Sequence, residues 1–146
     1  MRQFQLAEMY ARLALGSAFL SSVADRFGLW GPYGHKNVSW GDFAHFVHYT
    51  GMVNSFLPAR MFPALAWMAT CAETALGLGL ILGIYRRVMA MSSAALLLMF
   101  ASGMTISFGV KSAIDYSVFT ASAAAFLLAA TYQTAEANAE RQKSAG

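Results

Sequence analysis

Residues Phe62 to Ile84 read FPALAWMATCAETALGLGLILGI, and this stretch decides the fold class. Glu73, near its middle, is its one charged residue. About 20 apolar helical residues are enough to cross the hydrocarbon core of a bilayer. Pro63 stands near the first helical position, where its missing N–H costs little. The stretch therefore predicts a transmembrane helix at residues 62–84.

Three other stretches have similar length and hydropathy. Residues 88–108 carry no charge, residues 113–132 carry only Asp115, and residues 6–24 are interrupted by Glu8 and Arg12. The alternative for residues 6–24 is a signal peptide cleaved after Ser22-Val23-Ala24, which Arg12 disfavours because it lies just before the apolar core. The links at residues 85–87 and 109–112 are short, so we expect antiparallel helical hairpins.

The composition of the whole chain also indicates a protein that is surrounded by lipid. Hydrophobic residues make up 58% of the 146 residues and charged residues only 12%, whereas a soluble domain usually carries about 25% charged residues. The net charge of +3 does not indicate nucleic-acid binding, because the basic residues are scattered and only Arg86 and Arg87 are adjacent. The predicted fold is an all-α integral membrane bundle of four transmembrane helices, forming one domain at residues 1–132 with a polar tail at 133–146.

The long link between the first two spans predicts an additional amphipathic helix at residues 39–56. Ser39 is suited to cap it, with Asp42 as the capping-box partner three residues later. Helical spacing places apolar side chains on one face and polar side chains on the other. The apolar face would comprise Trp40, Phe43, Phe46, Val47, Thr50 and Val53, and the polar face Asp42, His45, His48 and Tyr49.

The distribution of basic residues predicts an orientation. If the Arg86-Arg87 turn faces the cytoplasm, both termini are also cytoplasmic and residues 25–60 lie on the outer side. Five basic residues then lie inside and four outside, the latter diluted over a long loop, which agrees with the tendency of short cytoplasmic segments to be basic.

Glu73 is the sharpest candidate for a functional residue. A carboxylate near the bilayer midplane is costly unless it is paired, so such residues usually face the bundle interior. We predict an intramembrane polar pair of Glu73 with Arg12, although Glu8, four residues before Arg12, competes as a local partner. The alternatives are a ligand or proton site at Glu73, or a protonated Glu73 facing a neutral cavity.

A second cluster is expected at the outer rim, where several elements end. The pocket candidates are Asp25, Arg26, Trp30, Asn54, Lys111, Asp115 and Tyr116. The simpler alternative is structural: Ser112 and Asp115 have the spacing of a capping box, and the charged residues can pair at the surface.

Metal binding is not expected. Asp42, His45 and His48 are weak candidates, because their spacing spreads them around the polar face of the helix. No motif in the sequence indicates a catalytic residue, so we predict none.

The runs RLALG at residues 12–16 and ETALGLGLILG at 73–83, followed by Arg86-Arg87 and set in a four-span layout, resemble the DoxX family of small bacterial membrane proteins. The resemblance covers about residues 10–132. Many members have a basic residue near the end of the first helix, a region that Asp25-Arg26 occupies here. The resemblance implies a plasma-membrane protein, because the family is similar to membrane subunits of thiosulfate:quinone oxidoreductase.

From the resemblance we expect a non-catalytic membrane subunit or anchor of a quinone-linked redox system, with a quinone as possible cofactor. Its partners would be the bilayer and a membrane or redox protein, or further copies of the chain. One alternative is a small membrane enzyme or binding protein that holds a lipophilic ligand between its helices. Another is a structural subunit of a larger membrane complex without a ligand.

Overall fold

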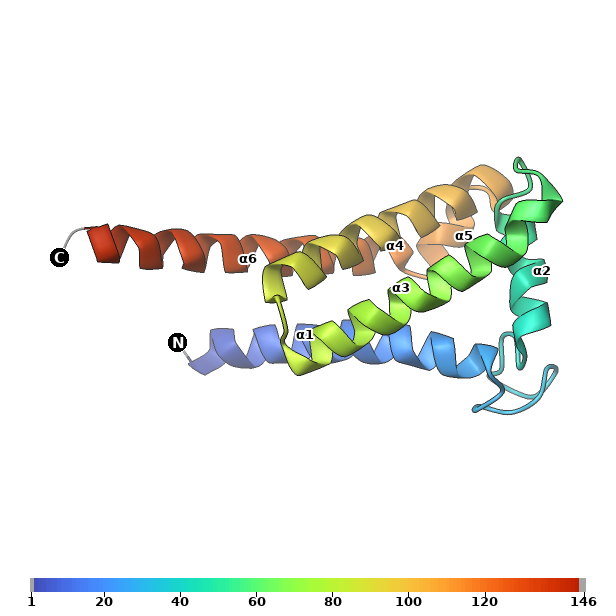
Figure 1. Cartoon of the computed structure of the whole chain (residues 1–146), viewed down its shortest axis with the longest axis horizontal. Coiled ribbons are helices and arrows are strands. Elements are labelled where there is room, and N and C mark those ends of the chain that lie inside the picture. Colours follow the sequence, from blue (N-terminus) through green and yellow to red (C-terminus); the bar gives the residue numbers. More distant parts are fainter. Residues whose placement is uncertain (1, 145–146) are drawn as a thin grey trace.

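Helices account for all the regular structure in the part of the chain that the computed structural model describes, which is the backbone of residues 2–144 and the side chains of 3–135 and 141–144. In chain order the elements are α1 (Arg2–Arg26), α2 (Phe43–Val53), the short 3-10 helix η1 (Ala59–Met61), α3 (Phe62–Leu82), α4 (Arg86–Phe108), α5 (Val110–Asp115) and α6 (Val118–Ser144). The long helices α1, α3, α4 and α6 run along the same axis, and α2 and α5 lie at one end of them (Figure 1).

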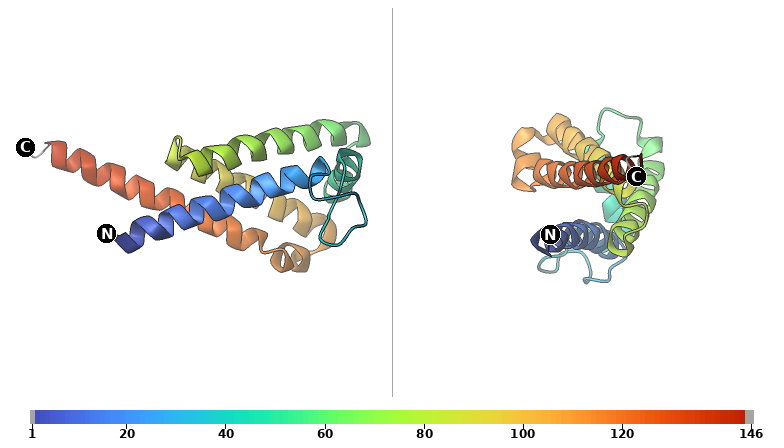
Figure 2. Two further views of the ribbon diagram at one scale, coloured as in Figure 1. Left: turned by 90° about the horizontal axis from the view of Figure 1, so that it is seen from below. Right: turned by 90° about the vertical axis from the view of Figure 1, so that its left-hand side faces the viewer.

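The long helices are arranged as two closely packed pairs, α1 with α3 and α4 with α6. Seen along the axis in Figure 2, α1 lies beside α3, and α4 lies beside α6. Side chains from all four helices meet in one apolar core between the pairs. Its buried members are Leu15, Phe19, Leu76, Leu80, Ala90, Ala94, Ala125, Leu128, Ala129 and Tyr132.

The α1–α3 contact depends on two glycines. A Cβ placed on Gly16 would lie 2.9 Å from the carbonyl oxygen of Gly77, and a Cβ on Gly77 would lie 3.1 Å from the carbonyl oxygen of Gly16. Small residues at such positions let two helix backbones approach closely, which is the main source of helix association in lipid. The 73–83 run thus includes one glycine, Gly77, at which the backbones of α1 and α3 approach closely.

Among the described residues, three segments are long and apolar enough to cross a membrane: Ala59–Leu82, Arg86–Phe108 and Val118–Ala135. Fewer than half of the residues in each are buried inside the protein. Large apolar side chains such as Leu98, Ile106 and Leu127 instead face outward. A surface of this kind is matched to lipid rather than to water.

Helix α1 is as long as these segments but more polar, so the expectation of a span at residues 6–24 is not confirmed by its composition. Its charged residues Glu8 and Arg12 lie toward one end, and Asp25 and Arg26 lie at the other. The four-span reading therefore rests on the position of α1 in the bundle, and it stays a prediction.

Two predicted helices have different bounds in the structure. The helix expected at 39–56 is shorter, because Asp42 rather than Ser39 is its N-cap: the Asp42 side chain accepts the backbone N–H of His45 at 2.9 Å. The span expected at 113–132 is divided into α5 and α6 by Ser117, whose φ of 55° is incompatible with a continuous right-handed helix.

The tail predicted at 133–146 continues α6 as helix to Ser144, and residues 145–146 lie outside the described part. The start of α1, the end of α6 and the α3–α4 turn lie at one end of the molecule, which we call the turn end (Figure 1). The loop at 27–42, α2 and α5 lie at the opposite end, which we call the capped end.

Replacing Gly77 with Leu should separate α1 from α3, because its side chain would collide with Leu20 and the Gly16 backbone. We expect a loss of about 1–3 kcal/mol in the free energy of unfolding, the usual cost of overpacking. The measurement is reversible unfolding in mixed micelles. Ala64→Leu, at an exposed position of α3, is the matched control and should change stability little. Equal effects of the two substitutions would contradict the close-packing role of Gly77.

Candidate functional site

A buried ion pair joins the end of α1 to the middle of α3. The Nη2 of Arg26 lies 2.7 Å from both carboxylate oxygens of Glu73, and both residues are only 2% exposed. The same nitrogen donates to the hydroxyl of Ser22 at 3.1 Å, and Nη1 donates to the hydroxyl of Thr70 at 2.9 Å. A charged hydrogen-bonded pair of this kind lets both ionised groups remain away from water.

The predicted partner of Glu73 was wrong, because Arg12 lies elsewhere. Arg12 approaches Glu8 at 3.9 Å and packs its guanidinium against Gly83 at the turn end. The pairing with Arg26 follows from two properties of α1. The helix continues two residues past the predicted end at 24, and side chains of a helix point back toward its N-terminus. Arg26 therefore reaches from the helix end to the level of Glu73.

Two aromatic rings lie next to the guanidinium of Arg26. The Cζ atom of Arg26 lies 3.6 Å from the centre of the Phe46 ring and 5.3 Å from the centre of the Trp40 ring. Attraction between a cation and a ring face strengthens when water is excluded. The apolar face predicted for the loop helix thus contributes the lid of the ion pair, with Phe46 buried as expected.

Asp25 orders the loop that carries this lid. Its carboxylate accepts the backbone N–H groups of Ser39 at 2.8 Å, Trp40 at 3.2 Å and Gly41 at 3.4 Å, and the residue is 5% exposed. Gly41 is required here, because its φ is +67° and a Cβ would lie 2.2 Å from the backbone nitrogen of Tyr33. Adjacent residues 25 and 26 therefore bind the loop and α3, respectively.

The other residues predicted for the outer rim do not gather around a pocket. Trp30 is exposed and donates its indole N–H to the carbonyl oxygen of Ser21, and Asn54 caps the end of α2. Lys111 pairs with Asp115 within α5, so Asp115 does not form the predicted capping box with Ser112, and Tyr116 is exposed. Of the residues predicted for the outer rim, Asp25 and Arg26 belong to the buried group of contacts around Glu73 and the loop.

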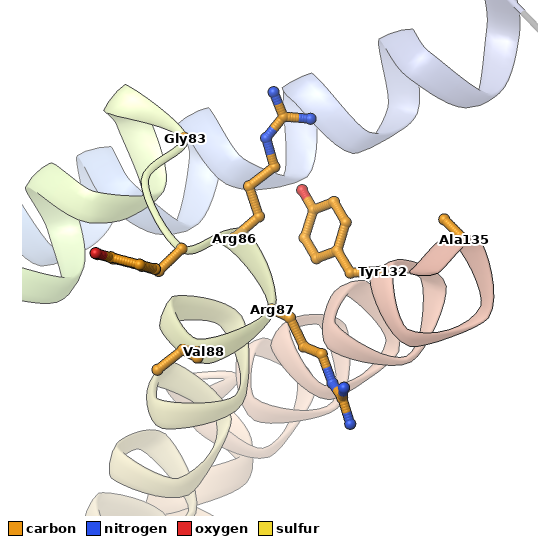
Figure 3. A pocket seen from close by; sticks show the side chains of 7 residues that line it. Gly83, Arg86, Arg87, Val88, Tyr132 and Ala135 are labelled. Atoms are coloured by element: carbon orange, nitrogen blue, oxygen red, sulfur yellow. The ribbon is translucent and has the colours of Figure 1, made fainter. Parts of the chain in front are cut away.

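A second polar cluster lies at the turn end and was not predicted as a unit. The hydroxyl of Tyr132 donates to Glu8 at 2.8 Å, and Arg86 approaches the same carboxylate at 3.4 Å. Figure 3 shows Arg86 extending from the start of α4 toward α1, beside the Tyr132 ring. The charges of Glu8 and Arg12, which interrupt the first apolar stretch in sequence, are the signal that could have indicated this cluster.

The residues considered as weak metal candidates lie on α2 or at its start, where Asp42 caps the helix. The carboxyl of Asp42 accepts the backbone N–H of His45 and contacts its ring Nδ1 at 2.8 Å, and these bonds lower the pKa of Asp42. His48 is exposed on the same helix. Among the described side chains, no three of the His, Cys, Asp and Glu residues come together as a metal site would require.

Both carboxylate oxygens of Glu73 contact the guanidinium of Arg26, and two cavities lie elsewhere in the described part of the protein. One of about 470 Å³ lies at the turn end, and an apolar groove of about 410 Å³ lies between α3 and α4. Seven residues line the groove: Ala72, Ala75, Leu76, Ser92, Ala95, Leu96 and Met99. Glu73 lines neither cavity.

Comparison with known proteins gives one match. The model of the family described as DoxX matches residues 7–107, which is more than half of the chain and includes both partners of the buried ion pair. No curated protein and no solved structure matches the chain.

Removing either partner of the buried pair should strongly destabilise the protein. Arg26→Met and Glu73→Met each leave one buried charge without its partner, which costs about 3–5 kcal/mol in proteins. The double variant should lose much less than the sum of the two single losses, because it leaves no unpaired charge. Unfolding of all three in mixed micelles gives the coupling energy. Lys111→Met, which breaks an exposed pair, is the control, and additive effects of the buried substitutions would refute the coupling.

Loss of the Asp25 carboxylate should release the loop at the capped end. In Asp25→Ala, three backbone N–H groups lose their acceptor, so we expect faster amide exchange at residues 39–41 and faster proteolysis of the loop. Mass spectrometry of the exchanged protein measures this directly. Asp115→Ala, at an exposed carboxylate of α5, should leave exchange at 39–41 unchanged. If both variants behave alike, Asp25 does not hold the loop.

Proposed function

Because the chain belongs to the DoxX family, we propose that it is a non-catalytic subunit or anchor of a quinone-linked redox system in the bacterial plasma membrane. One observation supports the non-catalytic part of the proposal: both carboxylate oxygens of Glu73 contact the guanidinium of Arg26, and the residue is 2% exposed. A substrate or a transferred proton would have to displace this contact, so we assign Glu73 a structural role.

The proposal includes a bundle of four transmembrane helices, with α1 as the least apolar member. Its charged residues lie toward its two ends, where Glu8 and Arg12 meet Tyr132 and Arg86, and Asp25 and Arg26 meet the loop and α3. These charged groups contact polar partners inside the protein, and the uncharged middle of α1 is compatible with lipid.

The proposed orientation has both termini in the cytoplasm and residues 25–60 on the outer side. The start of α1 and the end of α6 both lie at the turn end (Figure 1), where α4 begins with Arg86 and Arg87 and the last turn of α6 carries Arg141 and Lys143. Basic residues accumulate on the cytoplasmic side of short loops and span ends.

The redox part of the proposal is supported by the similarity of the family to membrane subunits of thiosulfate:quinone oxidoreductase. The apolar outer faces of α3, α4 and α6 give a partner subunit or further copies of the chain a surface to pack against. The proposal requires no chemistry from this chain itself, because the partner would carry the redox group.

A second candidate function is favoured by the groove between α3 and α4. Its volume of about 410 Å³ is in the range of ligand sites, and its lining is apolar apart from Ser92. A lipophilic ligand such as a quinone would match the apolar lining of this groove. In that case the function of the chain would be to bind the ligand. A subunit of a larger complex without a ligand is the third possibility.

Purification of the tagged chain from native membranes in mild detergent tests the proposal. We expect a redox subunit, recognised by flavin, haem or iron–sulfur absorbance, to comigrate at fixed stoichiometry. Quinone reduction by the membranes should fall when the chain is deleted. The Arg26→Met/Glu73→Met double variant, if folded, should restore it as well as the original chain, because no acid of the ion pair is needed.

Three outcomes would speak against the proposal. Quinone reduction by the purified chain alone would make it an enzyme. A folded double variant that fails to restore activity would make the ion pair functional. A quinone in the lipid extract that is lost in Ala75→Phe, which fills the groove, and retained in Ala64→Phe would favour the binding protein.

A further inference from the structure

The larger of the two cavities lies at the α3–α4 turn, where the chain leaves one apolar span and begins the next. It measures about 470 Å³, within the usual range of about 300–1,000 Å³ for ligand sites. Its lining includes Gly83, Tyr85, Arg86, Arg87, Val88 and Tyr132. In Figure 3, Arg86 and Arg87 extend to opposite sides of the turn, and Tyr132 lies opposite the turn on α6.

Among the described side chains beside this cavity, two guanidinium groups share one carboxylate. Among the described contacts, Glu8 is the carboxylate that approaches both Arg12, at 3.9 Å, and Arg86, at 3.4 Å. Its Oε1 also accepts the Tyr132 hydroxyl. The Arg86 side chain is 55% exposed, so most of its donors remain available. Within this described cluster, the formal charges of Glu8, Arg12 and Arg86 sum to +1.

The start of α4 adds hydrogen-bond donors to the same place. The first N–H groups of a helix have no acceptor within the helix. The N-cap residue Tyr85 has a left-handed conformation and gives no side-chain bond to them. The positive end of the helix dipole therefore faces the cavity without a capping side chain, an arrangement that favours an anion.

The surroundings of the cavity are apolar on the membrane side. Leu82 is 66% exposed, Ile84 46% and Val88 59%, and they flank the turn between two spans. A free phosphate ion would gain no favourable contact with this apolar surface, whereas the acyl chains of a lipid would pack against it. An anionic headgroup bears one net negative charge that matches the local surplus, and a zwitterionic headgroup would bring its own cation next to Arg86.

We propose that the turn cavity binds the phosphate of one anionic phospholipid, such as phosphatidylglycerol, between Arg86 and the start of α4. The exposed apolar side chains of the turn hold the upper part of its acyl chains. This site is separate from the buried Arg26–Glu73 pair, and it does not depend on a redox partner.

Native mass spectrometry of the full chain tests the proposal, in micelles that contain phosphatidylcholine and phosphatidylglycerol. We expect one retained phosphatidylglycerol per chain, and about fivefold weaker retention in Arg86→Gln, the effect typical of one basic residue at an anionic surface. Arg86→Lys should keep the preference. Arg60→Gln, which removes an exposed arginine at the capped end, should bind as the original chain does.

Val88→Glu provides a second variant that removes no existing ionic contact. Val88 is exposed and lines the cavity, so a carboxylate there should abolish the preference by repulsion without disturbing the core. Equal retention of both lipids, or equal losses in Arg86→Gln and Arg60→Gln, would overturn the proposal. So would displacement of the lipid by inorganic phosphate at the same phosphorus concentration, because the site would then select the free anion.

Discussion

The ion pair between Arg26 and Glu73 is the constraint to which the capped half of the structure conforms. A carboxylate in the middle of an apolar span is too costly to leave unpaired, and its guanidinium partner is equally costly. The pair therefore fixes the register of α1 against α3, and the close contact of Gly16 and Gly77 lies within the same interface. Phe46 and Trp40 complete the enclosure from the loop side.

The adjacent Asp25 extends this constraint to the loop. Because residues 25 and 26 end the same helix, whatever positions Arg26 against Glu73 also positions the Asp25 carboxylate under the N–H groups of residues 39–41. The loop then presents Trp40 and the start of α2 to the guanidinium. Helix packing, loop order and charge burial at the capped end are thus linked through adjacent contacts, and we expect them to be energetically coupled.

The sequence predicted the features that follow from local composition and missed those that follow from tertiary geometry. The all-helical class, the apolar spans at 62–84 and 88–108 and the need of Glu73 for a partner depend on hydropathy and on the cost of a charge in lipid. The predicted pairing of Glu73 with Arg12 was wrong, because α1 continues to Arg26 and the side chain of Arg26 points back along the helix to the level of Glu73. The break at Ser117 could not be predicted, because a serine with positive φ has no distinctive local signal.

The two ends of the bundle satisfy their charges in different ways, and the difference bears on function. At the capped end each buried charge is matched inside the protein, and Asp25, Arg26 and Glu73 have almost no exposed surface. At the turn end one carboxylate serves two guanidinium groups, and Arg86 stays half exposed beside an open cavity. A polar group whose partners lie inside the protein has little to gain from a ligand, whereas an exposed cation that shares its carboxylate with a second cation has more to gain. Charged molecules from outside the chain are thus expected at the turn end, and the contacts of Glu73 favour a structural role.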